Sequence, residues 1–245
     1  MNLVIDIGNT LTKVALFRGH DLVKLWRGEQ ADAAVIQELT GRETVSAAIV
    51  SSVKTAGEDL LPPTMQFLRE ADFPVLMAGN HLSIPITMHY KTPETLGTDR
   101  LAAAIAANHR FPNEHVLVIN AGTCLTFDFV NEHSEYLGGS IAPGLQMRLK
   151  ALHEYTGNLP LLMPTDNDVP LSGQSTKESV LSGVTNGMMA EIDGMIDNWQ
   201  QKISFFNVVI SGGDAFFFDK KLKNRIFAVD NIVLHGLNII LQYNV

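Results

Sequence analysis

Cysteine is almost absent from this sequence. Cys124 is the only one among 245 residues, which excludes a disulfide framework and any zinc site built from several cysteines. Long apolar runs are missing as well, because no stretch of about 18 apolar residues is available to cross a membrane as a helix. The first residues, MNLVIDIG, place no basic segment ahead of an apolar one, so they do not resemble a secretory signal. We therefore expect a soluble, cytoplasmic protein.

Positive charge is also scarce. The chain has 18 Lys and Arg against 26 Asp and Glu, which gives a formal net charge of −8. An acidic protein of this kind is not expected to carry a broad nucleic-acid interface. If the protein binds a polyanion, local backbone donors, a few placed cations and a metal ion must hold it, because the overall field repels it.

The remaining composition is that of an ordinary globular protein, with 46% hydrophobic and 18% charged residues. Apolar runs at 3–7, 14–17 and 22–26 predict a meander of three strands. DRLAAAIAANH, residues 99–109, predicts a helix that is rich in alanine and leucine. Strands alternate with helices in this part of the chain, and that order predicts an α/β fold.

One pattern, an apolar strand followed by a polar residue, glycine and threonine, occurs twice. The first copy is LVIDIGNT at 3–10, the second is LVINAGT at 117–123, and each is followed by another apolar strand. Chance recurrence is one explanation, and two similar lobes, each with a Gly-Thr turn, are the other. A junction within HRFPNE would divide the chain into an N-terminal lobe at 1–110 and a C-terminal lobe at 111–245.

Two further glycine patterns have both structural and functional explanations. Residues 211–214, SGGD, follow an apolar strand and fit either a tight turn or a close backbone approach to a flat ligand. Gly183 and Gly187 lie within a predicted helix, where glycine lowers helix propensity. Close packing against another helix, for example across a dimer axis, would explain that pair.

Residues 6–13, DIGNTLTK, place several residue types that can bind a phosphate at one strand turn. Gly8 lets the backbone approach a phosphate, Thr10 and backbone N–H groups donate hydrogen bonds, and Lys13 adds a positive charge. The Asp6 carboxylate would repel a phosphate unless a divalent cation lies between them, which predicts magnesium. The segment matches neither the P-loop nor the dinucleotide fingerprint, and a solvated hairpin turn remains the alternative.

Residues 97–100, GTDR, stand at the start of the predicted helix. Thr98 or Asp99 could serve as its N-cap, and that role would explain either residue alone. Together with Arg100 and the free N–H groups of the helix start, Asp99 also forms a site suited to a hydroxyl nucleophile beside an anionic group. The helix N-terminus favours an ionised Asp99, which in phosphoryl transfer would orient the hydroxyl and accept its proton late.

Taken in order, these motifs resemble the type III pantothenate kinases of the acetate and sugar kinase/Hsc70/actin superfamily. The resemblance includes DIGNT-x-x-K, GTDR, the second GT, GGSIAPG, STKE (which also fits a capping box) and SGG, and it covers nearly all 245 residues. It implies an α/β fold of two duplicated actin-like (ribonuclease H-like) lobes with a nucleotide cleft between them. It also implies ATP-dependent phosphorylation of pantothenate to 4′-phosphopantothenate, the first step of coenzyme A synthesis, by a homodimer with its substrate site near the interface.

The resemblance further implies roles for individual residues. ATP would bind to Asp6, Ile7, Gly8, Asn9, Thr10, Leu11, Thr12, Lys13, Gly122 and Thr123. Pantothenate would bind to Tyr90, Gly97, Thr98, Asp99, Arg100 and Thr176, with its carboxylate on Arg100. Asp99 would be the general base, and Asp6 would hold magnesium through water or phosphate.

Asn120 departs from the family pattern. The family usually has an aspartate before the second Gly-Thr, where it binds a monovalent cation, typically potassium. The amide oxygen of Asn120 can still coordinate potassium or ammonium, but it supplies no negative charge. We therefore expect the dependence on potassium to be weak or absent.

Two alternatives to a pantothenate kinase stay open at this point. The first is a non-catalytic regulator or ligand sensor on the same fold, which Asn120 keeps open. The joint presence of Asp6, Lys13, Asp99 and Arg100 argues against it, because a sensor needs no general base. The second is a kinase for a related hydroxy acid, since Tyr90 and Arg100 do not distinguish pantothenate from a similar acid.

Overall fold

The computed structural model describes residues 1–52, 63–165 and 168–245. The chain forms two compact units. Unit 1 comprises Met1–Arg110, Ser134–Tyr136 and Asn231–Val245, and unit 2 comprises Phe111–His133 and Leu137–Asp230. This differs from a simple division after residue 110, because the apolar C-terminal helix packs on the strands of unit 1.

Unit 1 is built on a five-stranded sheet in the order β3-β2-β1-β4-β5. β1 (Asn2–Ile7), β2 (Thr12–Arg18) and β3 (Asp21–Gly28) form the expected antiparallel meander. β4 (Ala47–Ser52) and β5 (Val75–Met77) continue the sheet in parallel beyond β1. β1 therefore lies inside the sheet, which agrees with the burial of its four apolar residues, Leu3, Val4, Ile5 and Ile7.

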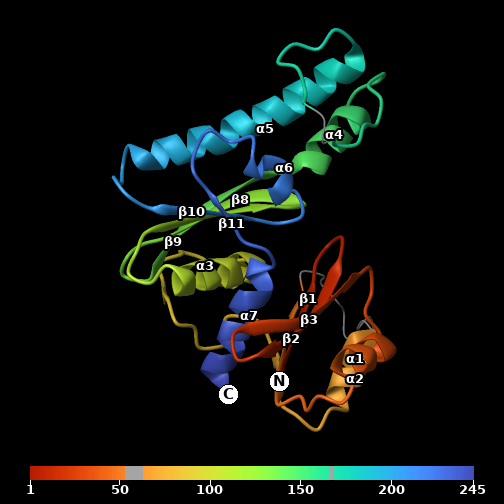
Figure 1. The fold of residues 1–245 in the computed structure, drawn as a ribbon, viewed down its shortest axis with the longest axis vertical. Helices are drawn as coiled ribbons and strands as arrows, with labels where there is room; N and C mark the ends of the chain where they lie inside the picture. Colours follow the sequence, from red (N-terminus) through yellow and green to blue (C-terminus); the bar gives the residue numbers. More distant parts are fainter. Residues whose placement is uncertain (53–62, 166–167) are drawn as a thin grey trace. The chain divides into compact units, whose positions relative to one another are not determined.

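Helices cover both faces of this sheet. α1 (Ala33–Thr40) and α2 (Pro63–Arg69) contact each other, and Ile36 and Leu68 from these helices join the apolar cluster formed by one face of the strands. α7 (Ile232–Asn244) contacts β1 and β4, and it packs along α3 (Thr98–Arg110), as Figure 1 shows. A Cβ atom at Gly236 in α7 would overlap the carbonyl of Ala102 in α3, so glycine permits this close helix crossing.

A short strand and a 3-10 helix precede α3. β6 (Thr87–Met88) pairs in parallel with Glu135 and Tyr136, the first part of β9 (Glu135–Pro143) that belongs to unit 1. The 3-10 helix η1 (Pro93–Thr95) then leads into α3. This arrangement fixes the segment that carries Tyr90 on one side and GTDR on the other.

Unit 2 repeats the strand arrangement of unit 1. β7 (Val116–Ala121) pairs antiparallel with β8 (Cys124–Val130) and parallel with β10 (Asn207–Ser211), as β1 does with β2 and β4. β11 (Phe227–Ala228) lies beside β10, and β9 lies beside β8. The repeated sequence pattern therefore corresponds to a repeated arrangement of strands. The glycine-rich GGSIAPG segment, which could have been a simple loop, forms the end of β9 and the turn into α4.

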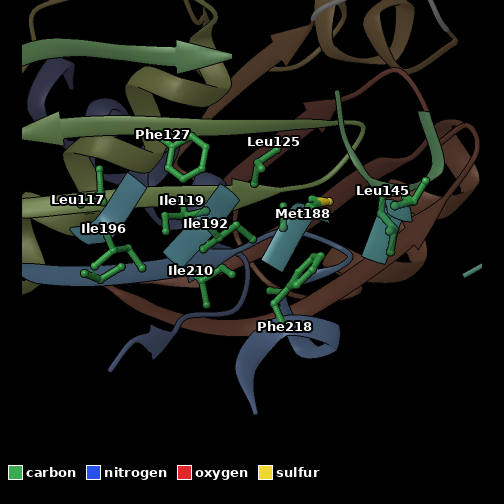
Figure 2. Close-up of a cluster of buried hydrophobic side chains, with 14 of the residues drawn as sticks. Leu117, Ile119, Leu125, Phe127, Leu145, Met188, Ile192, Ile196, Ile210 and Phe218 are labelled. Atoms are coloured by element: carbon green, nitrogen blue, oxygen red, sulfur yellow. The ribbon is translucent and has the colours of Figure 1, made fainter. Parts of the chain in front are cut away.

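Three helices accompany the sheet of unit 2: α4 (Leu145–Glu154), α5 (Thr176–Gln200) and α6 (Ala215–Asp219). Figure 2 shows side chains from α5, including Met188 and Ile192, packed among residues from the strands. The most deeply buried members of this cluster are Leu117, Ile119, Ala121, Leu125, Met188, Ile192, Ile196, Ile210 and Phe218. α5 is therefore held firmly against the sheet, because most of its apolar side chains are removed from water.

The start of α5 confirms Ser175 as the predicted cap, but the Glu178 side chain bonds the N–H of the residue before the cap and not that of Ser175. The Ser175 hydroxyl accepts a hydrogen bond from the Glu178 N–H (3.2 Å), and the Glu178 carboxylate accepts one from the Gln174 N–H (2.7 Å). Within the described ranges, no helix is long and apolar enough to cross a membrane.

Candidate functional site

The β1–β2 hairpin places Asp6 directly opposite Lys13. The turn between the strands is closed by a hydrogen bond from the Gly8 N–H to the Leu11 carbonyl (3.0 Å). Residues directly opposite each other on antiparallel strands project from the same face of the sheet. The spacing in DIGNTLTK therefore brings a carboxylate and an ammonium group together, as phosphate-binding chemistry requires.

The environment of Asp6 disfavours the ionised form of its carboxyl group. Burial raises the pKa of Asp6 to about 6, against the opposing effect of the positive charge on Lys13. The negative charge of Asp99 raises the pKa further, and a hydrogen bond with the Ser51 side chain lowers it. A buried carboxylate with a second carboxylate in electrostatic reach is the kind of group that an additional cation would stabilise.

Ser51 is a site residue that the sequence analysis missed. It stands opposite Asp6 on the parallel strand β4, and its side chain is fully buried. Its Oγ lies 2.8 Å from Oγ1 of Thr98. A hydrogen bond with Ser51 also lowers the pKa of Asp6, so Ser51 interacts with both Asp6 and Thr98. Ser51 thus links the β1–β2 hairpin to the start of α3.

The signal for Ser51 is present in the sequence. AAIVSS is an apolar strand whose last residues are polar, and Asp6 occupies the same place near the end of β1. Adjacent parallel strands end at the same edge of a sheet, so polar residues at their ends come together. Finding Ser51 required the pairing of β4 with β1, and the sequence alone did not give that pairing.

GTDR opens α3, with Thr98 as the first helical residue and the Leu101 N–H donating to the Gly97 carbonyl (3.1 Å). Asp99 therefore lies within the first turn and is not the cap. Its Oδ1 accepts a hydrogen bond from the Arg100 N–H (2.9 Å). A Cβ atom at Gly97 would lie 2.5 Å from Oδ1 of Asp99, so glycine leaves room for the carboxylate. The helix start stabilises negative charge at this position.

Arg100 and Tyr90 lie together beside Asp99. The Arg100 side chain is buried, and its guanidinium carbon lies 5.9 Å from the centre of the Tyr90 ring. The Tyr90 ring in turn lies 6.0 Å from that of Tyr136. Unit 1 thus places an aromatic ring close to the guanidinium group of the residue that follows Asp99, a combination suited to an organic acid.

The other residues of the β1–β2 turn fall into two groups. Ile7 and Thr12 are buried, and the Thr12 hydroxyl donates to the Glu29 carbonyl (3.1 Å). Asn9, Thr10 and Leu11 are exposed at the turn. Only the exposed group offers its side chains to a ligand at this turn, whereas Ile7 and Thr12 serve the packing of the hairpin.

In unit 2, glycines bring three chain turns against one another. The Gly122 N–H donates to the Cys124 carbonyl (3.0 Å), and the Gly144 N–H donates to the Thr123 carbonyl (3.1 Å). A Cβ atom at Gly144 would overlap the Gly122 carbonyl, and one at Gly212 would overlap the Ala121 carbonyl. Gly212 also has φ of +105°, which L side chains rarely adopt.

These contacts mean that the second Gly-Thr turn, the PG turn before α4 and the SGG turn meet backbone to backbone. The SGG turn is tied in by a hydrogen bond from the Asp214 N–H to the Ala121 carbonyl (2.9 Å). Such a group of glycine turns lets a ligand approach the backbone closely, which suits a phosphate or a flat ring. Burial raises the pKa of Asp214 at the edge of this group.

Asn120 occupies the position in unit 2 that Asp6 occupies in unit 1. It stands opposite Thr126 on the antiparallel neighbour and opposite Ser211 on the parallel neighbour. Its Oδ1 would lie 2.7 Å from a Cβ atom on Gly212, so the amide faces the SGG turn. The corresponding set in unit 2 is therefore neutral.

Thr176 is the first residue of α5 and is exposed. It lines a hollow of about 1610 Å³ between α4 and α5, with Met147, Ala151, Leu152, Tyr155 and Val180 among the other lining residues. The predicted site residues thus divide between the units. Unit 1 carries Asp6 to Lys13, Tyr90 and Gly97 to Arg100, and unit 2 carries Asn120, Gly122, Thr123 and Thr176.

In the parts of the chain that the structure describes, no three His, Cys, Asp or Glu side chains gather in an arrangement that could hold a metal ion. A metal held only by such protein side chains is therefore not found among these residues. Magnesium in phosphoryl-transfer sites is usually held by one or two carboxylates together with the substrate phosphates. Asp6, buried and electrostatically coupled to Asp99, fits that arrangement.

Comparison with solved structures supports the two-lobed arrangement. A conserved Baf family protein from Campylobacter jejuni, named for transcriptional activation, has a TM-score of 0.60 at 20% identity and aligns over 98% of this chain and 97% of its own. A ROK family glucokinase from Streptomyces griseus, in complex with glucose and AMPPNP, has a TM-score of 0.52 at 12% identity, with 97% of each chain covered. At these identities the likeness concerns the fold, two actin-like lobes.

Sequence comparison is more specific. The sequence model of the type III pantothenate kinase family matches residues 2–198. A type III pantothenate kinase from Bacteroides fragilis (strain YCH46) is 43% identical over 244 residues, which cover 100% of this chain and 98% of that protein. One from Cytophaga hutchinsonii is 39% identical over 245 residues, with 100% of both chains covered. The chain therefore belongs to the type III pantothenate kinase family.

Proposed function

We propose that this protein transfers the γ-phosphoryl group of ATP to the primary hydroxyl of pantothenate, giving ADP and 4′-phosphopantothenate, the first step of coenzyme A biosynthesis. The observation that carries the proposal is the grouping of Asp6, Lys13, Ser51 and Asp99 in unit 1, beside Arg100 and Tyr90. Membership of the family supplies the substrate.

Asp99 is the proposed general base. Its carboxylate lies in the first turn of α3, where it can accept a hydrogen bond from the pantothenate hydroxyl. As the new O–P bond forms and the bond from the γ-phosphorus to the ADP oxygen breaks, the hydroxyl proton passes to Asp99. The transition state of phosphoryl transfer is loose, so positioning of the hydroxyl contributes more than early proton removal.

Arg100 and Tyr90 are the proposed contacts for the rest of pantothenate. A guanidinium group binds a carboxylate through a fork of N–H donors, and Arg100 follows Asp99 directly in the chain. The buried stem of Arg100 and the nearby Tyr90 ring limit the positions its guanidinium group can take. This pairing fixes the distance between the acid end of the substrate and the base, which selects a hydroxy acid of one length.

We assign the nucleotide phosphates to two sets of donors. Asn9, Thr10 and Lys13 contribute donors from the β1–β2 turn, and Thr123 contributes one from the β7–β8 turn. Gly8 and Gly122 let the phosphates approach the backbone of these turns. Magnesium, held by Asp6 through water or phosphate, would neutralise phosphate charge when it is bound. This combination supplies local positive charge in a protein whose net charge is −8.

We further propose that potassium or ammonium activates this protein weakly or not at all. Asn120 offers one neutral oxygen, which faces Gly212. The test replaces potassium and ammonium with a large organic cation in the activity assay. We expect activity to change by less than about twofold, and an Asn120→Asp variant to gain a dependence on potassium, because a carboxylate binds the cation more strongly. Strong activation of the unaltered protein by potassium would contradict this.

We propose a homodimer that uses the surface around the hollow between α4 and α5. Cβ atoms at Gly183 and Gly187 would meet nothing within 4 Å, so neither glycine is explained by packing inside the described chain. Tyr155 and Leu171 are also strongly exposed near α4 and α5. Thr176 lines the hollow, which would place a substrate contact near that interface. We place the reaction in the cytoplasm, where ATP is available.

The proposed function is tested by a coupled assay of ADP release with and without pantothenate. We expect release that depends on pantothenate and an equal amount of 4′-phosphopantothenate by mass spectrometry. Absence of pantothenate-dependent release would overturn the proposal. ATP binding without turnover would favour a ligand sensor, and release with a different hydroxy acid but not with pantothenate would favour a related kinase.

A further inference from the structure

Arg148 in α4 binds two acceptors that lie on different elements. Its Nε donates to the Pro143 carbonyl (2.8 Å), and one of its terminal nitrogens donates to the carboxylate of Glu191 in α5. Its own N–H also donates to the Gly144 carbonyl (3.0 Å), as the first turn of α4 requires. One side chain therefore ties the turn formed by Pro143 and Gly144 to α5.

That turn is packed against the second Gly-Thr turn. The Gly144 N–H donates to the Thr123 carbonyl, and the backbone at Gly144 lies so close that a Cβ atom would overlap the Gly122 carbonyl. Movement of Pro143 and Gly144 would therefore move Gly122 and Thr123. These two residues form the turn that we assign to the nucleotide phosphates.

The other end of the Arg148 bridge is fixed. Glu191 lies in α5 next to Ile192 and three residues after Met188, both of which are fully buried against the sheet of unit 2. Arg148 and Glu191 are themselves shielded, with side-chain exposures of 22% and 33%. A shielded, charge-assisted pair with a planar donor group holds its geometry better than an exposed pair of flexible side chains.

We propose that Arg148 and Glu191 are positioning residues for ATP: they hold the turn formed by Pro143 and Gly144, which in turn holds the Gly122–Thr123 turn in its phosphate-binding conformation. The inference rests on the proposed function, since it concerns the affinity of that same site for the nucleotide. Neither side chain contacts the phosphates in this account. Their loss should therefore weaken ATP binding and leave the chemical step largely unchanged. Arg148 also lines the hollow that contains Thr176, whereas Glu191 does not, so loss of Glu191 should leave pantothenate binding largely unchanged as well.

Four variants separate the contacts. Arg148→Met removes every donor and keeps the length of the side chain, and Glu191→Leu removes the anchor on α5. Arg148→Lys keeps the charge but cannot reproduce two diverging N–H donors, so it should rescue only part of the effect. Glu191→Gln keeps an acceptor at the same place and should rescue most of it.

Lys223→Gln is the matched control. It removes another ion pair to α5, between Lys223 Nζ and Asp197 Oδ2 (2.6 Å), from an exposed lysine. An exposed pair of this kind contributes little to stability, so the KM for ATP should not change.

The experiment measures kcat and the KM for each substrate, together with ADP affinity by calorimetry and Tm. We expect the KM for ATP and the Kd for ADP to rise about tenfold in Arg148→Met and Glu191→Leu, with kcat at saturating ATP within about twofold. The KM for pantothenate should also stay within about twofold in Glu191→Leu, because Glu191 does not line the hollow that contains Thr176. A merely structural role would lower Tm and the active fraction, and hence kcat, without raising the KM for ATP.

The outcomes are distinguishable. If the unaltered protein releases no ADP in response to pantothenate, the proposed function fails. If it is active and both variants keep the KM for ATP of the unaltered protein, the positioning role is overturned. Should Arg148→Met fail to fold, Arg148→Lys and Glu191→Gln decide: a KM for ATP that is raised in the first and nearly normal in the second supports the proposal, and equal values contradict it.

Discussion

The two units use the same strand arrangement with different side chains at corresponding positions. In unit 1, Asp6 stands between Lys13 on the antiparallel neighbour and Ser51 on the parallel neighbour. In unit 2, the corresponding residues are Asn120, Thr126 and Ser211. The polar serine is kept in both, whereas the carboxylate and the lysine have only neutral counterparts in unit 2.

The difference in charge indicates that the two units have different roles. Unit 1 places charged side chains at its hairpin. One of them, Asp6, is a buried carboxylate whose ionised form is unfavourable, as its raised pKa indicates. Unit 2 relies on backbone, with glycines that let three turns meet. We therefore assign the chemical step to unit 1 and part of the nucleotide binding to unit 2.

The largest effect should follow from removing the charge that distinguishes unit 1. Asp6→Asn makes this position resemble Asn120, and we expect turnover to fall by about a thousandfold, because the magnesium ligand is lost. The same change should stabilise the protein without ligands. Since the pKa of Asp6 rises on folding from 3.8 to about 6, ionisation favours the unfolded state.

The stability of the unaltered protein should accordingly fall as the pH rises from 3.8 to about 6, and this part of the pH dependence should be missing in the variant. At pH 7.5 the free energy of unfolding of Asp6→Asn should exceed that of the unaltered protein by about 2 kcal/mol. This is less than the pKa shift of Asp6 implies, because Lys13 loses the negative charge that it faces. Urea unfolding in the presence of a chelator measures both quantities. An Asp6→Asn protein that is less stable at pH 7.5 would contradict this account of Asp6.

A smaller effect should follow from disturbing the backbone packing of unit 2. Gly144→Ala places a methyl group against the Gly122 carbonyl, so the two turns must separate. We expect the KM for ATP to rise by about ten- to a hundredfold, with a lower Tm. Gly194→Ala in α5 is the control, because a Cβ atom there meets nothing within 4 Å and alanine favours the helix. Equal KM values for ATP in the two variants would contradict the assignment of the glycine turns to the nucleotide site.

The smallest effect should come from the position that both units share. Ser51→Ala removes the hydrogen bonds of the hydroxyl with Asp6 and Thr98, which should lower kcat/KM by about tenfold. Thr40→Ala in α1 removes a comparable hydroxyl hydrogen bond, to the Ile36 carbonyl, far along the chain from the site residues. If both variants had the activity of the unaltered protein, Ser51 would be only a buried polar residue.

Much of the fold follows from local sequence patterns. The meander at the N-terminus, the helix that begins at GTDR and the cap at Ser175 were all predicted, because alternation, propensity and cap residues act over short distances. The assignment of the C-terminal helix to unit 1 was not. That result depends on long-range packing of α7 on α3, made possible by Gly236, and a single glycine within a helical segment does not reveal its partner.

The candidate site was predictable to a similar extent. The Asp6 to Lys13 and Gly97 to Arg100 segments could be identified because each places its chemistry within a few residues. Ser51 and the bridge from Arg148 to Glu191 could not, because their partners are distant in the sequence and meet only through strand pairing and helix packing. Thr12 fits the phosphate motif in the sequence, but its hydroxyl is engaged by Glu29.

The assignment of the chemical step to unit 1 and of part of the ATP binding to unit 2 is tested most directly with Asp99→Asn, whose turnover and ATP affinity are measured together. The substitution keeps the size of the side chain and an acceptor for the Arg100 N–H, but it removes the base. Our account predicts a turnover lower by about a thousandfold, with ATP affinity within about twofold of the unaltered protein. Near-normal turnover, or a loss of ATP affinity equal to the loss of turnover, would contradict the assignment of the chemical step to Asp99 in unit 1.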